Sequence, residues 1–220
     1  MVAFLASTIL SVVALRFLPV YFTPLMFIRC SQQISEGKDL KLSHHWVPLE
    51  KISPYLPLAV MGSEDANFLN HHGFDYKAIE HAAKRNREHP EKRKLGASTI
   101  SQQTAKNVFT LHKRTVWRKA VEGWFTLLIE WIWGKERILE VYLNVAEMGK
   151  GIYGAQAAAE AYWSKTASEI TRRQACLIAA CLPSPLKRSP VKPGEYVSRQ
   201  ANVISARENN ISYPDWIYHK

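Results

Sequence analysis

Two adjacent acidic residues, Glu64 and Asp65, follow an apolar run that extends from Leu56 to Met61. A carboxylate at the end of a buried segment loses part of its hydration, which raises its pKa and makes it a better base near neutral pH. The pair therefore indicates general-base chemistry, with Glu64 as the base and Asp65 as an orienting or capping neighbour. The alternative is that the pair only caps a short helix.

A second stretch, residues 96–107, reads G-A-S-T-I-S-Q-Q-T-A-K-N and contains one large apolar residue, Ile100. A solvent-facing helix would normally carry Glu and Lys pairs four residues apart. The neutral hydrogen-bonding groups found here suit a wall that contacts sugar hydroxyls, amides or phosphate. The alternative is a polar helix capped by Ser98 or Thr99.

Cations are concentrated just after this stretch. On a helix, Arg114, Arg118 and Glu122 would lie along one face at four-residue spacing, with Lys119 beside them. Two guanidinium groups and an ammonium group on one stripe predict a site for phosphate or pyrophosphate. Glu122 is either an ion-pair partner of Arg118 or a second active-site carboxylate.

The composition limits the class of protein. The chain has 220 residues, which suffices for one domain or for one domain and an anchor. An apolar fraction of 47% with seven Trp residues indicates a packed core. A net charge of +10 predicts an anionic partner, and nucleic acid, a membrane surface and a phosphorylated substrate all satisfy it. Three cysteines do not make a disulfide framework.

The first 28 residues are mostly apolar and contain one charged side chain, Arg16. A membrane-spanning helix needs roughly 20 apolar residues, and Arg16 at mid-bilayer would cost about 2.5–3.5 kcal/mol. We therefore expect a span made of Val2–Leu15 and upstream residues, followed by a hydrophobic segment at the membrane interface. Pro19 and Pro24 should interrupt the helix. The alternative is a buried core helix.

Between these stretches the pattern is mostly helical. Three prolines in Trp46–Pro57 predict an extended lead-in, after which Pro57 suits the first turn of a helix that reaches Glu64. Apolar residues at helical spacing predict a helix over Phe74–Arg87. Trp124–Trp133 is nearly all apolar but too short to span a bilayer, so it is a core helix or a membrane-facing surface.

Five blocks in this order resemble the peptidoglycan glycosyltransferases of glycosyltransferase family 51, and specifically the monofunctional biosynthetic transglycosylases. The blocks are E-D-x-x-F-x-x-H-x-G from Glu64 to Gly73, G-x-S-T-I-x-Q-Q-x-x-K-N from Gly96 to Asn107, R-K-x-x-E from Arg118 to Glu122, K-x-x-I-L-E-x-Y-L-N from Lys135 to Asn144, and G-x-x-G-x-x-x-A-A-x-x-Y from Gly151 to Tyr162. The chain departs from the family pattern at Asn67, where Arg is familiar, and at Trp163, where Phe is usual.

The resemblance implies a mainly α fold: a lysozyme-like helical catalytic domain with an N-terminal membrane anchor. Residues 1–28 would form the membrane anchor and interfacial segment, residues 29–45 a connector, and residues 46–220 the glycosyltransferase domain. It places the protein in the bacterial plasma (inner) membrane as a single-pass protein, with the catalytic domain on the periplasmic or outer face.

The resemblance also implies polymerisation of lipid II into β-1,4-linked glycan strands with loss of undecaprenyl pyrophosphate. Glu64 matches the general base and Glu122 the second essential acid. The remaining implied site residues are the pyrophosphate ligands Lys106, Arg114, Arg118 and Lys119 and the hydrogen-bonding cleft wall Ser98, Thr99, Gln102, Gln103 and Asn107. A divalent cation, Mg²⁺ or Mn²⁺, would bind through pyrophosphate oxygens. Partners would be lipid II, the growing strand and membrane lipid, with no nucleic acid; partners among cell-wall synthesis or division proteins stay open.

Two other functions compete with this interpretation. A lysozyme-like lytic glycosidase would also use a catalytic Glu in a helical domain, but would have no use for the cationic stripe. A membrane-tethered basic module for nucleic acid or anionic lipid would need charge and no base. Ser184 and Lys187 fit the S-x-x-K pattern of penicillin-binding domains, but the sequence has no K-T-G and we interpret the match as chance.

Overall fold

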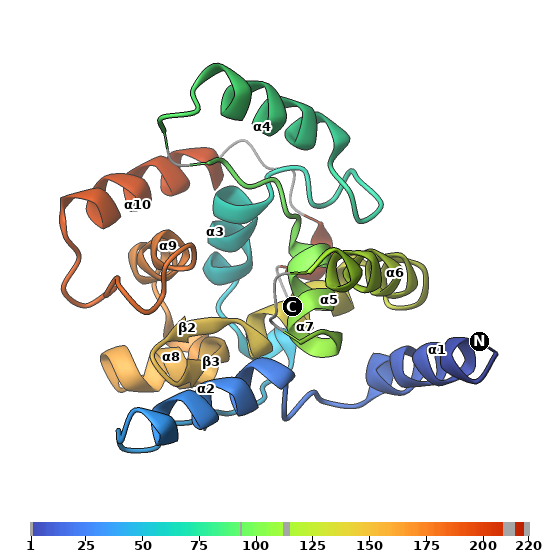
Figure 1. Cartoon of the computed structure of the whole chain (residues 1–220). Helices are drawn as coiled ribbons and strands as arrows, with labels where there is room; N and C mark the ends of the chain where they lie inside the picture. The colour runs from blue at the N-terminus through green and yellow to red at the C-terminus, as the bar shows by residue number, and fades with distance from the viewer. Residues whose placement is uncertain (1, 93, 112–114, 209–213, 218–220) are drawn as a thin grey trace.

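The computed structural model describes residues 2–92, 94–111, 115–208 and 214–217, and this part of the chain is mainly helical (Figure 1). The helices are α1 (Val2–Phe17), α2 (Pro24–Ser35), α3 (Tyr55–Glu64), α4 (Tyr76–Glu88), α5 (Ile100–Phe109), α6 (Val116–Ile132), α7 (Gly134–Val145), α8 (Gly154–Trp163), α9 (Arg172–Cys181) and α10 (Glu195–Glu208). Short 3₁₀ turns cover Leu49–Lys51, Ala167–Glu169 and Asp215–Ile217, and the strands are β1 (Ser43–His44), β2 (Glu147–Gly149) and β3 (Ile152–Tyr153).

Helix α3 lies in the middle of the molecule, with α9 and α10 on one side and α5, α6 and α7 on the other (Figure 1). Its side chains from Leu56 to Met61 are buried, which explains its apolar sequence. Pro57 lies in the first turn of α3, as predicted, and the helix ends at Glu64. The predicted helix after Gly73 is also present as α4, where the Asp75 side chain accepts a hydrogen bond from the Ala78 N–H.

A small sheet in the order β1-β3-β2 joins distant parts of the sequence. Strand β1 pairs in parallel with β3, so that Ser43 aligns with Ile152, and β2 pairs antiparallel with β3. Gly151, between β2 and β3, has a φ of +66°, and a Cβ there would lie 2.2 Å from the Lys41 carbonyl oxygen. The stretch expected to be only a connector, residues 29–45, therefore contributes part of α2 and strand β1 to the fold.

Helix α1 packs against α6 on one face and is exposed on the other. The Trp124 indole donates to the Thr8 hydroxyl at 3.2 Å, and the Trp133 indole donates to the Val12 carbonyl at 2.7 Å. Arg16 donates to the Ile132 carbonyl at the end of α6, which is a favourable position for a cation at a helix C-terminus. The helical conformation is interrupted between Phe17 and Pro24, as Pro19 and Pro24 predict.

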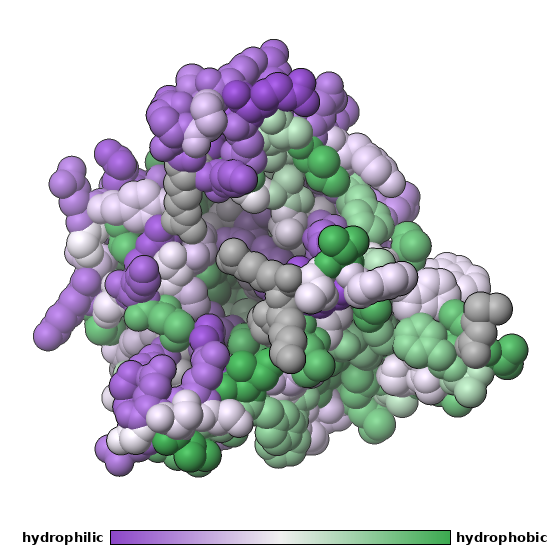
Figure 2. Space-filling view, in the orientation of Figure 1, coloured by the Kyte–Doolittle hydropathy of each residue, from purple (hydrophilic) through white to green (hydrophobic). Residues whose placement is uncertain are grey.

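No helix in the described ranges is both long and apolar enough to cross a membrane. The expected span over Val2–Leu15 is instead a 16-residue helix docked on α6, with exposed apolar side chains on its outer face. Hydrophobic surface also gathers between α2 and α1 along the lower edge of Figure 2, whereas the surface over α4 is hydrophilic.

The apolar stretch Trp124–Trp133 lies within α6, which has one buried face and one exposed face. Phe125, Leu128 and Ile129 are buried in the core, whereas Trp117 and Trp131 are 82% and 84% exposed. A helix with one buried face and exposed tryptophans on another face provides a large apolar surface patch, of the kind that marks an interaction site.

Candidate active site

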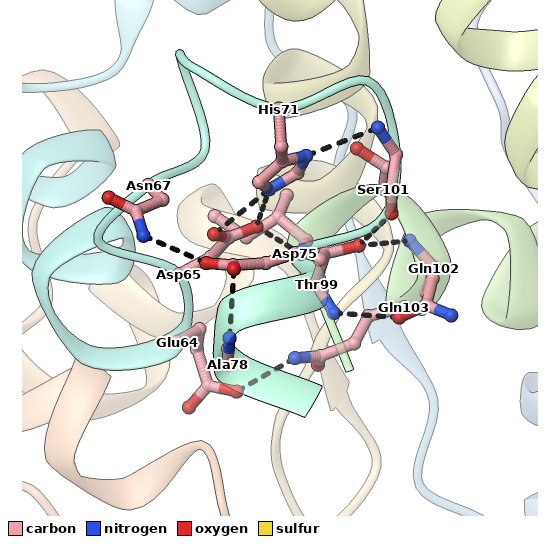
Figure 3. A network of polar contacts seen from close by, with 12 residues as sticks. Glu64, Asp65, Asn67, His71, Asp75, Ala78, Thr99, Ser101, Gln102 and Gln103 are labelled. Carbon is pink, nitrogen blue, oxygen red and sulfur yellow. Dashed lines mark hydrogen bonds and ion pairs between the residues drawn. The ribbon is translucent and has the colours of Figure 1, made fainter. Parts of the chain in front are cut away.

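Glu64 is the last residue of α3, and its half-buried side chain lies at the edge of a polar network, which it joins through Gln103 (Figure 3). The Gln103 side-chain N–H donates to Glu64 Oε2 at 2.8 Å. Burial raises the pKa of Glu64 above its ordinary value, while the Gln103 hydrogen bond and the Lys106 and Arg188 charges partly oppose that rise. The carboxyl group therefore has the environment of a general base with an elevated pKa.

Asp65 is buried and its oxygens are occupied by neighbours that orient the surrounding backbone. Asp65 Oδ2 accepts the Ile100 N–H at the start of α5 at 3.0 Å and lies 2.9 Å from His71 Nε2. The Gly73 N–H donates to His71 Nδ1 at 3.1 Å, so the His71 proton faces Asp65 (Figure 3). Asp65 thus has the orienting and capping contacts that the sequence analysis predicted for it.

Helix α5 is held in place by a capping box at its N-terminus. The Thr99 hydroxyl accepts the Gln102 N–H at 3.1 Å and donates to the Gly73 carbonyl at 2.6 Å. The Gln102 side chain accepts the Thr99 N–H at 3.1 Å. Thr99 and Gln102, both predicted for the cleft wall, are buried, and these contacts position α5.

Two hollows lie on either side of Gln103. The first, which we call the Glu64 hollow, has a volume of about 470 Å³ and includes Ser98 and Gln103 in its lining. The second, the Lys106 hollow, has a volume of about 190 Å³ and includes Gln103 and Asn107. Three of the five polar residues expected in the cleft wall, Ser98, Gln103 and Asn107, therefore line a hollow.

Gln103 also contacts Tyr142, which the sequence analysis did not include among the site residues. The Tyr142 hydroxyl donates to Gln103 Oε1 at 3.3 Å, which leaves the amide N–H₂ group facing Glu64. Tyr142 is fully buried, and its pKa is raised well above its ordinary value by burial, so the phenol stays a hydrogen-bond donor. The Y-L-N pattern of this segment gave no sign of that contact.

Lys106 lies close enough to both predicted catalytic acids, Glu64 and Glu122, for their charges to affect its pKa. Burial lowers its pKa, and the charges of Glu122 and Glu64 act in the opposite direction, which favours the ammonium form. Arg29 and Glu147 also line the Lys106 hollow. They form an ion pair with each other, in which Arg29 Nη2 lies 3.0 Å from Glu147 Oε2. Arg29 comes from α2, outside the part of the chain in which we expected site residues.

Glu122 on α6 is buried and bound by two cations. Arg118 Nη1 lies 2.5 Å from Glu122 Oε2, and Lys119 Nζ contacts Glu122 Oε1. The first alternative for Glu122, an ion-pair partner of Arg118, is therefore present, and the proximity to Lys106 is compatible with the second. The remaining predicted ligand, Arg114, lies outside the described residues.

The side chains of the described residues do not form a protein cage for a metal ion. Within the described ranges there is no group of three or more His, Cys, Asp or Glu side chains placed to hold one. Both oxygens of Glu122 already contact cations, and Glu64 has Gln103 on one oxygen. The donor set fits a divalent cation only if most ligands come from elsewhere.

Comparison with known proteins gives one consistent family. A model of the Transglycosylase family matches residues 31–208. A protein from Bacteroides thetaiotaomicron, named biosynthetic peptidoglycan transglycosylase, is 52% identical over 93% of this chain and 82% of its own length. Proteins with the same name from Caulobacter vibrioides (48% identical, 90% and 83%) and Xanthomonas campestris (45% identical, 97% and 87%) are also similar. The chain belongs to the transglycosylase family.

Proposed function

We propose that this protein is a peptidoglycan glycosyltransferase that polymerises lipid II into glycan strands. The observation that carries the proposal is the half-buried Glu64, with its raised pKa, next to a hollow and across Gln103 from Lys106. The family match over residues 31–208 and the names of the similar proteins support the same activity.

In the proposed reaction, Glu64 accepts the proton of the 4-hydroxyl group of the acceptor GlcNAc. The acceptor oxygen forms a bond to C1 of the donor MurNAc, and the bond from C1 to the pyrophosphate oxygen breaks with inversion. A hydroxyl group is a weak nucleophile at neutral pH, so a positioned base is expected to contribute about 10²–10⁴-fold to the rate.

The leaving pyrophosphate carries negative charge away from C1, and cations held in advance stabilise that charge. Lys106, Arg118 and Lys119 are our candidates, with Arg114 as a fourth from the sequence. The buried carboxylate of Glu122 would hold Arg118 and Lys119 at fixed positions, since it contacts both. Ser98, Gln103 and Asn107 would hydrogen-bond the sugars.

A divalent cation belongs to the proposal as a companion of the substrate. Because the protein offers few free ligands, Mg²⁺ or Mn²⁺ would be held mainly by pyrophosphate oxygens, where it would neutralise negative charge. Activity that is unchanged when EDTA replaces added metal would remove this part of the proposal.

We also propose that residues 1–28 hold the protein at the plasma (inner) membrane, with residues 46–220 acting on its periplasmic or outer face. The exposed apolar side chains of α1 and of the segment up to Phe27 support this placement. Upstream residues would be needed to complete a membrane span, because α1 has 16 residues and a span needs roughly 20.

The test is polymerisation of labelled lipid II by the wild type, Glu64→Gln and Glu122→Gln. We expect glycan polymer from the wild type and a loss of about 10²-fold or more in Glu64→Gln. Glu122→Gln should also lose activity, because two cations would lose their partner. Full activity of Glu64→Gln would refute the mechanism, and degradation of preformed peptidoglycan without polymer would identify a lytic glycosidase instead.

A further inference from the structure

A third hollow, of about 790 Å³, lies at the connection between α9 and α10. We call it the basic hollow, because its lining includes Lys187, Arg188 and Lys192 and no acidic residue. Tyr196 lines both the basic hollow and the Glu64 hollow, so the two are neighbours. In Figure 1 this connection loops along the left edge of the molecule from α9 to the start of α10.

The arrangement of the cations is determined by local structure. The N–H groups of Lys187 and Arg188 donate to the Ser184 carbonyl at 3.1 and 3.2 Å, which forms a tight turn. This turn brings Ser184 and Lys187 into the lining of the same hollow. Arg188 donates to the Ala180 carbonyl at 2.9 Å, and its guanidinium lies 4.4 Å from the centre of the Tyr196 ring.

None of these three cations has a carboxylate partner within the described part of the chain. Every ion pair found there uses other residues, whereas Arg118, Lys119, Lys135 and Arg137 all contact acids. Three neighbouring positive charges that form no direct ion pair in the described ranges repel one another, and an anion bound among them would relieve that repulsion.

We propose that the basic hollow binds a carboxylate group of the peptide carried by the acceptor lipid II. This inference rests on the proposed function. Lipid II is anionic at its pyrophosphate and at its peptide carboxylates, and Lys106 and the Glu122 cluster provide cations for pyrophosphate. The sugar whose hydroxyl group reaches Glu64 is followed directly by the peptide-bearing sugar, so the peptide should lie beside the Glu64 hollow.

Such binding would also affect the base. Burial raises the pKa of Glu64, and Arg188 is one of the positive groups that lower it. A carboxylate next to Arg188 would offset part of that positive charge, so Glu64 would become a stronger base when the acceptor is in place. Binding of the acceptor peptide would thereby raise the pKa of the catalytic carboxylate.

The test compares Lys187→Ala/Lys192→Ala with the wild type on two substrates: lipid II with free peptide carboxylates, and lipid II whose peptide carboxylates are amidated. Both lysines are exposed, so the variant should fold, and circular dichroism would check this. We expect kcat/KM to fall by about three- to tenfold for the carboxylate substrate, mainly through KM, since two solvent-exposed ion pairs are lost. The amidated substrate should react equally with both proteins.

The matched control is Lys51→Ala/Lys165→Ala, which removes the same charge from positions outside the basic hollow and the Glu64 hollow. We expect it to behave as the wild type on both substrates. An equal loss for both substrates would show that the lysines serve the pyrophosphate or the membrane surface, and no loss for either would mean that the hollow binds nothing in the reaction. Each of these results overturns the proposal.

A binding measurement separates this inference from the proposed function. The soluble peptide-bearing disaccharide, without pyrophosphate, is titrated into the ¹⁵N-labelled wild type and the Lys187→Ala/Lys192→Ala variant and followed by NMR. Binding that the double variant weakens supports the basic hollow even if lipid II is not polymerised. Equal binding, or none, refutes the hollow even if polymerisation is observed.

Discussion

Glu64 and Asp65 are adjacent in sequence, but their side chains have different neighbours. Glu64 faces a hollow and has one hydrogen bond, from Gln103, whereas Asp65 is buried between the Ile100 N–H and His71. The difference arises because α3 ends at Glu64, so the chain turns at Asp65 and sends the two carboxylates in different directions. The first is free to exchange a proton with a substrate, and the second is committed to holding the backbone.

This difference gives a prediction for Asp65→Asn. The variant keeps one oxygen for the Ile100 N–H but loses the negative charge that faces His71, so the free energy of unfolding should fall by about 1–3 kcal/mol. Its rate of lipid II polymerisation should fall less than that of Glu64→Gln. Chemical denaturation and initial rates would check both parts, and a larger rate loss in Asp65→Asn would assign the base role to Asp65.

The raised pKa of Glu64 predicts the acidic side of the pH–rate profile. The base must be ionised, so kcat/KM should fall as the pH drops through a pKa that lies above the ordinary Glu value of 4.5. The Gln103 hydrogen bond lowers the pKa of Glu64, so Gln103→Met should raise that pKa and move the acidic limb to higher pH. A shift to lower pH, or none, would show that another group controls this limb.

At the residue scale, the sequence predicted the side chains that belong to short, ordered motifs. Glu64, Lys106 and Glu122 are within such motifs, and the structure places Lys106 under the influence of both carboxylates. Tyr142, Arg29 and Arg188 were missed, because each reaches the site from an element far away in the sequence. No local pattern records that the Tyr142 hydroxyl meets Gln103, 39 residues earlier.

Among the elements, α5 is the one whose position matters most for the site, because it carries both Gln103 and Lys106. Its N-terminus is attached to the loop after α3 by two hydrogen bonds: the Ile100 N–H donates to the Asp65 carboxylate, and the Thr99 hydroxyl donates to the Gly73 carbonyl. A small rotation of α5 would separate Gln103 from Glu64.

Thr99→Ala should therefore affect both stability and activity. Loss of an N-cap side chain lowers the free energy of unfolding by about 0.5–2 kcal/mol, and the loss of the bond to Gly73 should displace Gln103 and reduce the polymerisation rate. Thr171→Ala is the matched control, since Thr171 caps α9 with the same capping box. Both variants should unfold at lower denaturant concentration, but only Thr99→Ala should lose substantial activity. Equal activity losses would contradict this role of α5.

Helices were predictable from periodicity and from proline positions, whereas the small sheet was not. Strands of two or three residues carry no detectable alternation, and the pairing of Ser43 with Ile152 joins segments that the sequence keeps far apart. The same limit explains why the sequence of residues 29–45 predicts only a connector. The segment is polar, but pairing of β1 with β3 and the Arg29–Glu147 ion pair bind it to the body of the protein.

For the whole molecule, the main asymmetry is between its hydrophilic surface over α4 and the apolar surface near α1, α2 and α6 (Figure 2). Both substrates of the proposed reaction carry polyprenyl chains, so an apolar surface next to the site would bring the cleft to the lipid.

The exposed tryptophans of α6 test this orientation. Trp117→Ser/Trp131→Ser should reduce binding to lipid vesicles, because tryptophan is favoured at membrane interfaces. Tyr76→Ser is the control, since Tyr76 is 76% exposed on α4, on the hydrophilic side. Vesicle flotation would measure both. Equal binding of the tryptophan variant and the control would mean that α6 does not face the membrane.

The Arg29–Glu147 pair described above has a mechanical consequence. It fastens α2 to β2 at the edge of the Lys106 hollow, and only six residues, 18–23, separate α2 from α1. A six-residue segment spans about 20 Å at most. If α1 rests in lipid, this short connection limits the distance between the bilayer surface and the pyrophosphate site. It therefore also limits how much of the polyprenyl chain must leave the membrane during each addition.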